Sequence, residues 1–302
     1  MSFYSALTYF LGGYTALVIA LYMLSTVVPV AGFAARSLAA YISLLISAIY
    51  GVLVSIVLRI LGREQIAQWT TARSFKYIMA LTTGITFEVI DPKHHLETVR
   101  PAVFIGNHQT ELDVLMLGCM FPKYCSVTAK KSLKKVPFLG WYMALSGTVF
   151  IDRKNSKDAR EAMAGAASEI QKRKQSVYIF PEGTRSYAKD PELLPFKKGA
   201  FHLAVQAGVP IVPVVVANYS HVLYIKNFVF RSGKIPIKVL DPIPTAGLKP
   251  EDVDELTRGT RELMLREMVA LTEKVRNKPI AVPATKDDGV VHASGVDATL
   301  SR

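Results

Sequence analysis

Two long apolar stretches open the chain. Residues 2–35 and residues 37–58 carry no charged side chain, and Arg36 alone separates them. Each stretch is long enough to cross a hydrocarbon core of about 30 Å as a helix. We therefore predict a membrane-associated segment over residues 1–60.

A bend is expected within this segment, because Pro29 and Gly32 both favour a turn. The bend would divide the segment into two helices, at about residues 5–30 and 38–60. Two membrane spans and a hairpin that enters one leaflet both fit this pattern. The remaining alternative is a pair of buried helices in a soluble core, where uncharged runs of such length are rare.

Short apolar runs follow, and they alternate with amphipathic ones. The apolar runs are rich in β-branched residues and are bounded by Gly, Pro, Asp or Lys, a pattern typical of strands. Strands are predicted at residues 86–90, 102–105, 124–127, 148–151, 177–180, 211–216 and 235–240. Helices are predicted at residues 60–79, 112–120, 157–174, 198–207 and 251–276.

This alternation predicts an α/β fold with a mixed, largely buried sheet flanked by helices. We place that domain at residues 61–276, after the two-helix membrane segment. Residues 277–302 are rich in Pro, Ala, Asp, Gly and Ser without periodicity, and they are predicted to form a disordered tail.

The charge balance is strongly basic, with a formal net charge of +12. Basic residues gather just after the apolar segment, which places that end on the cytosolic side of a membrane; they are Arg59, Arg63, Arg73 and Lys76. Beside an apolar anchor, such charge suits anionic lipid headgroups. No nucleic-acid partner is expected, because no recognised binding motif accompanies the charge. The two cysteines, Cys119 and Cys125, suit a reducing cytosol better than a disulfide framework.

A first polar block, Asn107 to Asp113, follows the predicted strand at 102–105. His108 and Asp113 are five residues apart, which is about 140° off a common helix face. They can meet only if His108 lies in the loop and Asp113 lies in the first helical turn. A carboxylate beside the imidazole would fix its tautomer and stabilise the imidazolium form.

Two observations weaken the spacing as evidence for catalysis. Thr110 and Asp113 also match a relaxed capping box, so Asp113 could cap the helix, alone or in addition. The same spacing recurs at His292 and Asp297 in the low-complexity tail, where no strand precedes it and no apolar helix follows. The structural setting therefore favours His108 as the candidate base.

A second polar block ends the predicted strand at 177–180. Glu182, Gly183, Thr184 and Arg185 would form the loop at that strand end. Glycine allows the backbone to approach a ligand closely, and the planar guanidinium suits bidentate binding of phosphate. The competing interpretation is a simple turn with an exposed arginine.

Two further blocks accompany the first pair. Residues 147–153 end in Asp152 and Arg153, which could form either a second ligand-binding pair or a surface ion pair. Residues 209–214 form a Pro-rich apolar strand, for which an edge or bulged position is the plain alternative.

Taken in order, these four blocks resemble the glycerolipid acyltransferase family. Within it they are most similar to the 1-acyl-sn-glycerol-3-phosphate acyltransferases of eukaryotic, fungal type. The matching blocks are NHQTELD at 107–113, GTVFIDR at 147–153, FPEGTR at 180–185 and VPIVPV at 209–214. The resemblance covers about residues 60–245, and the apolar N-terminal pair also looks like the membrane anchor of the family.

The resemblance implies transfer of an acyl group from acyl-CoA to the sn-2 hydroxyl of lysophosphatidic acid, giving phosphatidic acid. It implies that His108 is the general base and Asp113 its orienting partner. It also implies an acceptor-binding loop at Glu182, Gly183, Thr184 and Arg185, with Arg153 adding a second positive charge and Lys130 a weaker candidate for phosphate contact. An endoplasmic reticulum membrane, with the domain facing the cytosol, is the implied location, and a lipid droplet surface is the alternative.

The chemistry agrees with this interpretation. A positioned His typically accelerates attack of a hydroxyl on a thioester by about 10²- to 10⁴-fold. Direct transfer is expected, because no Ser or Cys nucleophile with a His partner is visible. No metal and no cofactor besides the co-substrate acyl-CoA are expected. The same chemistry on another acceptor such as glycerol 3-phosphate, a hydrolase, and a non-catalytic protein that binds anionic lipid remain as alternatives.

Overall fold

A seven-stranded mixed sheet organises the chain in the computed structural model, which describes residues 2–152 and 156–280. The strands lie in the order β1-β9-β6-β2-β5-β3-β4. Neighbouring strands are parallel except for β6 and β9, which are antiparallel. Their bounds are β1 Ile85–Ile90, β2 Val103–Gly106, β3 Cys125–Lys130, β4 Val149–Ile151, β5 Ser176–Ile179, β6 Ile211–Val216 and β9 Gly233–Val239. The predicted fold class is confirmed.

The Pro-rich strand β6 is not an edge strand, because it pairs with β9 on one side and β2 on the other. All six of its residues are buried. Pro213 is accommodated because the antiparallel pairing with β9 begins at Val214, one residue later, while the Pro213 carbonyl still accepts a hydrogen bond from Leu240. The edge interpretation is therefore wrong, whereas the pairing register does shift by one residue around Pro213, from Ile211 opposite Ile243 to Val214 opposite Val239.

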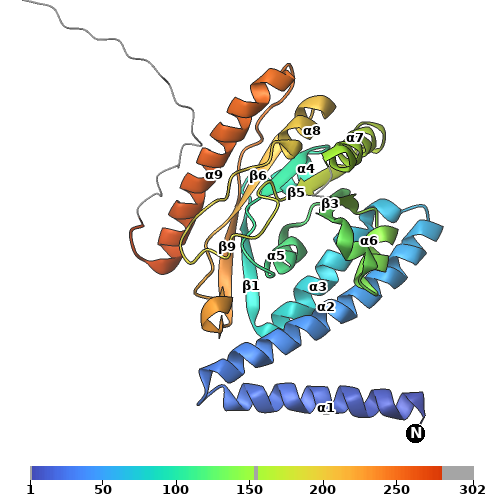
Figure 1. Cartoon of the computed structure of the whole chain (residues 1–302), viewed down its shortest axis with the longest axis vertical. Coiled ribbons are helices and arrows are strands. Elements are labelled where there is room, and N and C mark those ends of the chain that lie inside the picture. Colours follow the sequence, from blue (N-terminus) through green and yellow to red (C-terminus); the bar gives the residue numbers. More distant parts are fainter. Residues whose placement is uncertain (1, 153–155, 281–302) are drawn as a thin grey trace, which may run out of the picture.

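Helices cover both faces of the sheet (Figure 1). On one face, α3 (Ala67–Thr83) and α5 (Asp113–Met120) share a hydrophobic core with β1 and β9. On the other face, α7 (Ser156–Arg173), α8 (Gly199–Ala207) and α9 (Val253–Arg276) form a second core. Gly208 ends α8 in the left-handed conformation, as expected for a helix C-terminus. The sheet is therefore buried on both sides.

Several short elements were not predicted. They are the helices α4 (His95–Thr98) and α6 (Leu139–Leu145), the 3₁₀ turns η1 (Glu64–Ile66), η2 (Lys131–Lys135), η3 (Ile225–Asn227) and η4 (Pro250–Asp252), and the hairpin of β7 (Leu223–Tyr224) and β8 (Val229–Phe230). Each is too short to produce a clear hydrophobic period. From residue 281 onward, the predicted disordered tail lies outside the described residues.

The two N-terminal helices begin and end at other residues than predicted. Helix α1 spans Phe3–Leu24 and α2 spans Pro29–Ile60, so the turn lies at residues 25–28. Pro29 is the first residue of α2, a position that needs no backbone N–H donor. Arg36 therefore lies inside α2 and does not separate the two helices.

Arg36 is accommodated in this apolar helix because its guanidinium donates hydrogen bonds to backbone carbonyls of other elements. It donates from Nε to the carbonyl of Thr83 at the end of α3, at 3.2 Å, and from Nη1 to the carbonyl of Phe230 in β8, at 3.3 Å. It also lies 5.4 Å from the ring centroid of Tyr22 in α1. A single cation thus joins α1, α2, α3 and the β7–β8 hairpin.

Helix α2 has two different faces. One face packs on α3, α6 and β8 through small residues; they are Ala31, Gly32, Ala35, Ala39, Ser43, Ser47, Ala48, Gly51 and Ser55. The other face exposes large apolar side chains such as Leu53 and Ile56. Figure 1 shows α1 on the far side of α2 from the sheet. Both helices have the length and composition of membrane helices, so this side of the protein suits membrane association.

Candidate active site

The two polar blocks meet because their strands are neighbours. Strands β2 and β5 are parallel, with Val103 opposite Val177 and Ile105 opposite Ile179. Their carboxyl ends therefore lie side by side at one edge of the sheet, a common ligand site in α/β proteins. His108 follows β2 and Glu182 follows β5, and their residues touch although 74 positions separate them.

His108 and Asp113 form the contact that their spacing allowed. Asp113 is the first residue of α5, and its Oδ2 atom lies 2.7 Å from Nδ1 of His108. A carboxylate at this distance makes Nδ1 the protonated nitrogen and leaves the lone pair on Nε2. The ring stacks on Phe180 at a centroid distance of 4.1 Å, which restricts its rotation. The arrangement presents Nε2 as a base.

Other groups besides His108 also form hydrogen bonds with Asp113. Its side chain is 1% exposed, and Oδ2 also accepts hydrogen bonds from the backbone N–H groups of Gln109, at 2.6 Å, and Thr110, at 3.2 Å. The hydroxyl of Tyr219 donates to Oδ1 at 2.6 Å. These donors provide hydrogen-bond partners for both oxygens of the buried carboxylate. The N-cap of α5 is Leu112, which has no side-chain cap hydrogen bond, so the structure supports the orienting role of Asp113 and not the capping box.

Tyr219 is a site residue that the sequence did not reveal. Its hydroxyl accepts a hydrogen bond from the backbone N–H of Thr110 at 3.1 Å while donating to Asp113. Complete burial, followed by the charge of Asp113, raises the pKa of Tyr219 well above its usual value. It therefore remains a proton donor to Asp113. Tyr219 lies 106 residues after Asp113, so no local pattern signals it.

Glu182 lies beneath the histidine loop. Its carboxylate is 3% exposed, and it accepts hydrogen bonds from the backbone N–H of His108 at 2.7 Å and of Leu194 at 2.9 Å. Burial raises the pKa of Glu182 to about 8, against the effect of these two donors. Both carboxylate oxygens are thus occupied by the backbone. This placement favours positioning of the loop over direct contact with a ligand.

The rest of the second block is more open. Gly183 has a φ of +68°, a backbone conformation that favours glycine, and only the flexible end of the Lys197 side chain lies where a Cβ would be. Thr184 is exposed. Arg185 donates from Nη1 to Glu111 at 2.7 Å and to the hydroxyl of Tyr187 at 3.0 Å. Neither Glu111 nor Tyr187 was predicted as a site residue.

The structure gives less information on the two remaining candidate cations, Lys130 and Arg153. Lys130 is the last residue of β3, which pairs with β5 in parallel, so it lies at the same edge of the sheet with its side chain exposed. Arg153 follows β4 and lies outside the described residues. Among the side chains of residues 2–152 and 161–280, no group of three or more His, Cys, Asp and Glu could hold a metal ion.

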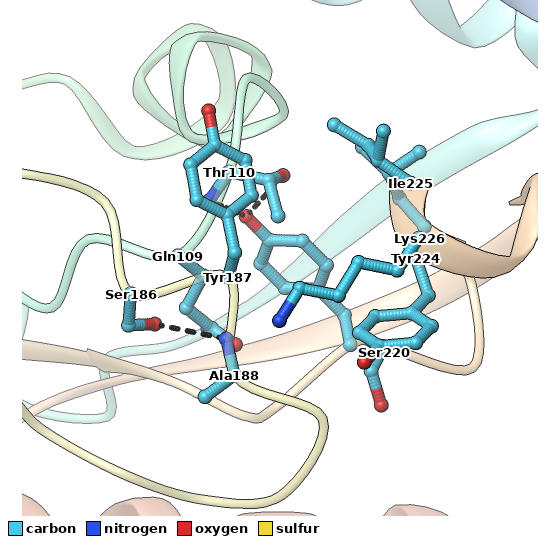
Figure 2. Close-up of a pocket in the computed structure, with 11 residues that line it drawn as sticks. Gln109, Thr110, Ser186, Tyr187, Ala188, Ser220, Tyr224, Ile225 and Lys226 are labelled. Atoms are coloured by element: carbon cyan, nitrogen blue, oxygen red, sulfur yellow. Dashed lines mark hydrogen bonds between the residues drawn. The ribbon is translucent and has the colours of Figure 1, made fainter.

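A pocket of about 450 Å³ adjoins the Asp113 network (Figure 2). Residues 109–110 of the histidine loop form one part of its wall, and residues 186–188, which follow Arg185, form another. The third part comes from residues 219–220 and 223–226, which include the first half of the β7–β8 hairpin. The pocket therefore connects the two polar blocks with an element that contacts α2.

Comparisons with known proteins agree with this geometry. The family model described as Acyltransferase matches residues 89–217. Over 230 residues the chain is 44% identical to a 1-acyl-sn-glycerol-3-phosphate acyltransferase of Saccharomyces cerevisiae, covering 76% of this chain and 75% of that protein. It is also 44% identical over 184 residues to the human 1-acyl-sn-glycerol-3-phosphate acyltransferase beta, covering 61% of this chain and 64% of that protein.

A solved structure matches the fold. The crystal structure of the 1-acyl-sn-glycerophosphate acyltransferase PlsC from Thermotoga maritima superposes with a TM-score of 0.61. The match covers 88% of this chain and 98% of that chain at 22% sequence identity. At this identity the likeness concerns the arrangement of helices and strands.

Proposed function

The chain belongs to the 1-acyl-sn-glycerol-3-phosphate acyltransferase family, and we propose on this basis that it acylates the sn-2 hydroxyl of 1-acyl-sn-glycerol 3-phosphate to give phosphatidic acid. The observation that carries this proposal is the 2.7 Å contact between His108 and Asp113, beside a loop that bears Arg185. A base next to a guanidinium suits an acceptor that has both a hydroxyl and a phosphate.

The proposed reaction is a direct transfer from acyl-CoA. Nε2 of His108 removes the proton of the sn-2 hydroxyl while its oxygen attacks the thioester carbonyl. The carbon–sulfur bond of the tetrahedral intermediate then breaks, and the proton on His108 passes to the leaving CoA thiolate. Asp113 stabilises the transient imidazolium, and Tyr219 and two backbone N–H groups hold the Asp113 carboxylate in place through hydrogen bonds.

Binding of the acceptor phosphate is assigned to Arg185, together with Arg153 and Lys130. The fork of Arg185 is suited to a phosphate, and Glu111 and Tyr187 already orient its Nη1 atom. Thr184 is exposed in the same loop and can donate from its hydroxyl. Gly183 allows the backbone of this loop to turn close to the acceptor. Glu182 holds the loop from below.

The membrane arrangement follows from the packing of α2. Its buried face contacts the α/β domain from Ala31 to Ser55, so α2 cannot cross a bilayer apart from that domain. We therefore propose that α1 and α2 enter one leaflet from the side on which the domain lies. An endoplasmic reticulum membrane, with the domain in the cytosol, is the proposed location, and it agrees with the basic residues after α2.

An acyl-transfer assay tests this function. Purified protein in vesicles is supplied with labelled acyl-CoA and one of four acceptors: lysophosphatidic acid, glycerol 3-phosphate, lysophosphatidylcholine or water alone. We expect phosphatidic acid from lysophosphatidic acid and much slower product formation from the others. Faster acylation of glycerol 3-phosphate or lysophosphatidylcholine would reassign the acceptor, and release of free fatty acid alone would indicate a hydrolase.

A further inference from the structure

The tip of the β7–β8 hairpin exposes apolar side chains beside the pocket. Ile225 is 39% exposed and Phe228 is 56% exposed, although both are large hydrophobic residues. Phe228 has a φ of +52°, a conformation that bulky residues seldom adopt. A strained turn that holds a phenylalanine in solvent indicates that the side chain is used for contact with something apolar.

This tip continues the apolar surface of the N-terminal helices. The ring of Phe228 packs edge-on against Phe33 of α2 at a centroid distance of 5.5 Å. The hydrogen bond from Arg36 to Phe230 fixes the hairpin to the same helix. In Figure 1 the gold turn that carries the tip lies beside the first turns of α2. The hairpin is thus held rigidly against the helices that suit a membrane.

The charges around the tip are of one sign. Residues 217–240 contain no Asp or Glu. Lys226 and Arg231 are exposed there, and neither side chain forms an ion pair with the described part of the chain. Exposed aromatic and aliphatic side chains next to cations are typical of elements that lie in the headgroup region of an anionic bilayer.

The hairpin also determines where the pocket opens. Leu223, Tyr224, Ile225 and Lys226 form one wall of the pocket, and Tyr187 faces them from the segment that follows Arg185 (Figure 2). An apolar tip in the bilayer would therefore bring the pocket mouth to the level of the lipid headgroups. A lysolipid could then reach the pocket without leaving the membrane with its acyl chain.

We propose that the β7–β8 hairpin is a second membrane-contacting element, which inserts Ile225 and Phe228 into the bilayer, places Lys226 at the headgroups and opens the pocket toward the lipid. The occupant of this surface is the bilayer, because the surface is continuous with α1 and α2 and carries positive charge with no Asp or Glu in residues 217–240. The inference rests on the membrane association in the proposed function and is independent of the acyl-transfer chemistry.

Depth-dependent fluorescence quenching tests the proposal on the full-length protein. Ile225→Cys and Phe228→Cys are each labelled with an environment-sensitive dye; both native thiols are buried, so the label is directed to the new residue. The labelled proteins are reconstituted into vesicles of phosphatidylcholine and phosphatidylserine, with or without bromine on the acyl chains. Ile19→Cys in α1 is the positive control. Arg258→Cys is the negative control, because Arg258 is exposed in the first turns of α9, which packs on the other face of the sheet from α3 and α5.

We expect brominated chains to quench dyes at residues 225, 228 and 19, and to leave the dye at residue 258 unchanged. Quenching at residue 19 without quenching at either hairpin position would overturn the proposal. It would indicate that a protein partner, and not the bilayer, covers the tip. Absence of quenching at all four positions would also overturn it, together with the membrane association. Neither result would contradict acyl transfer.

A kinetic measurement provides a second test. The Phe228→Ser variant, whose side chain does not line the pocket, should show a severalfold higher apparent KM for lysophosphatidic acid in vesicles, with kcat unchanged. With a short-chain, water-soluble acceptor the variant and the unmodified protein should behave alike, since no bilayer is involved. An equal loss with both acceptors would show that the hairpin supports the pocket alone and would contradict the membrane role.

Discussion

The carboxylate of Glu182 accepts a 2.7 Å hydrogen bond from the backbone N–H of His108, and thereby joins the ends of two neighbouring strands. Its other oxygen binds the N–H of Leu194. Replacing Glu182 with a residue that accepts no hydrogen bond would leave these two backbone donors unpaired. Each unpaired buried donor lowers the free energy of unfolding by about 1–3 kcal/mol. The loop that carries the candidate base is therefore built on Glu182.

The raised pKa of Glu182 makes stability depend on pH. A pKa of about 8 means that the folded state binds this proton more tightly than the unfolded chain. The contribution of Glu182 to the free energy of unfolding therefore falls as pH rises from the usual carboxyl range to about 8. Glu182→Gln removes this dependence. We expect the apparent Tm of the variant, relative to that of the unmodified protein, to increase by several degrees between about pH 5 and pH 8.

Thermal unfolding in detergent micelles measures this difference at each pH. Asp241→Asn is a suitable control, because this exposed aspartate pairs with Lys93 and His95 and has a lowered pKa. A Tm difference between Glu182→Gln and the unmodified protein that stays constant across the pH range would contradict the prediction.

Asp113→Asn should lower kcat by about 10⁴-fold with little change in KM, because an amide cannot stabilise the imidazolium and disturbs the tautomer of His108. Tyr219→Phe should cost about tenfold in kcat, as expected for one hydrogen bond to a charged group. Steady-state kinetics of both variants and of the double variant measure the coupling. If Tyr219 acts through Asp113, the double variant should be no slower than Asp113→Asn; fully additive losses would refute that link.

Arg185→Lys should raise the KM for lysophosphatidic acid by about tenfold, because one charge-assisted hydrogen bond of the guanidinium fork is lost. The KM for acyl-CoA should stay the same. Arg173→Lys is the matched control, since Arg173 forms an exposed ion pair with Glu64 away from the sheet edge. An unchanged KM for every phosphorylated acceptor would remove Arg185 from the phosphate site.

Gly183→Ala should destabilise the protein by about 1–2 kcal/mol, because an alanine at a φ of +68° is strained, whereas the flexible Lys197 side chain can move away from the added Cβ. Gly165→Ala in α7 is the matched control, because nothing lies within 4 Å of its added Cβ. It should stabilise the protein by about 0.5–1 kcal/mol. Chemical denaturation followed by circular dichroism compares the two, and equal effects would show that the conformation of Gly183 is not required.

The sequence predicted the parts of the fold that have strong local patterns. Alternating apolar runs gave the α/β sheet, and the strand-to-helix setting of His108 gave its contact with Asp113. The interpretation that placed β6 at the edge of the sheet was wrong, because strand pairing depends on segments far apart in the chain. The turn between the two N-terminal helices was expected around Pro29 and Gly32, but it lies at residues 25–28, because Pro29 begins α2 and Gly32 packs within it.

The buried residues that support His108 and Asp113 could not be predicted from the sequence either. The family resemblance placed Glu182 in the acceptor-binding loop, but its burial under His108 is a tertiary feature that the motif does not reveal. Tyr219 joins Asp113 only because β6 ends beside β2. Hydrogen bonds between strand ends depend on sheet order, which short-range patterns do not encode.

The central claim is that His108 is the base, and turnover of His108→Ala in vesicles tests it most directly. His95→Ala is the matched control, because His95 also contacts an aspartate, Asp241 at 2.9 Å, but follows β1, which runs antiparallel to β2. With both variants folded and membrane-bound, we predict that kcat for lysophosphatidic acid falls by about 10²- to 10⁴-fold in His108→Ala and is unchanged in His95→Ala. Near-normal turnover of His108→Ala would contradict the account.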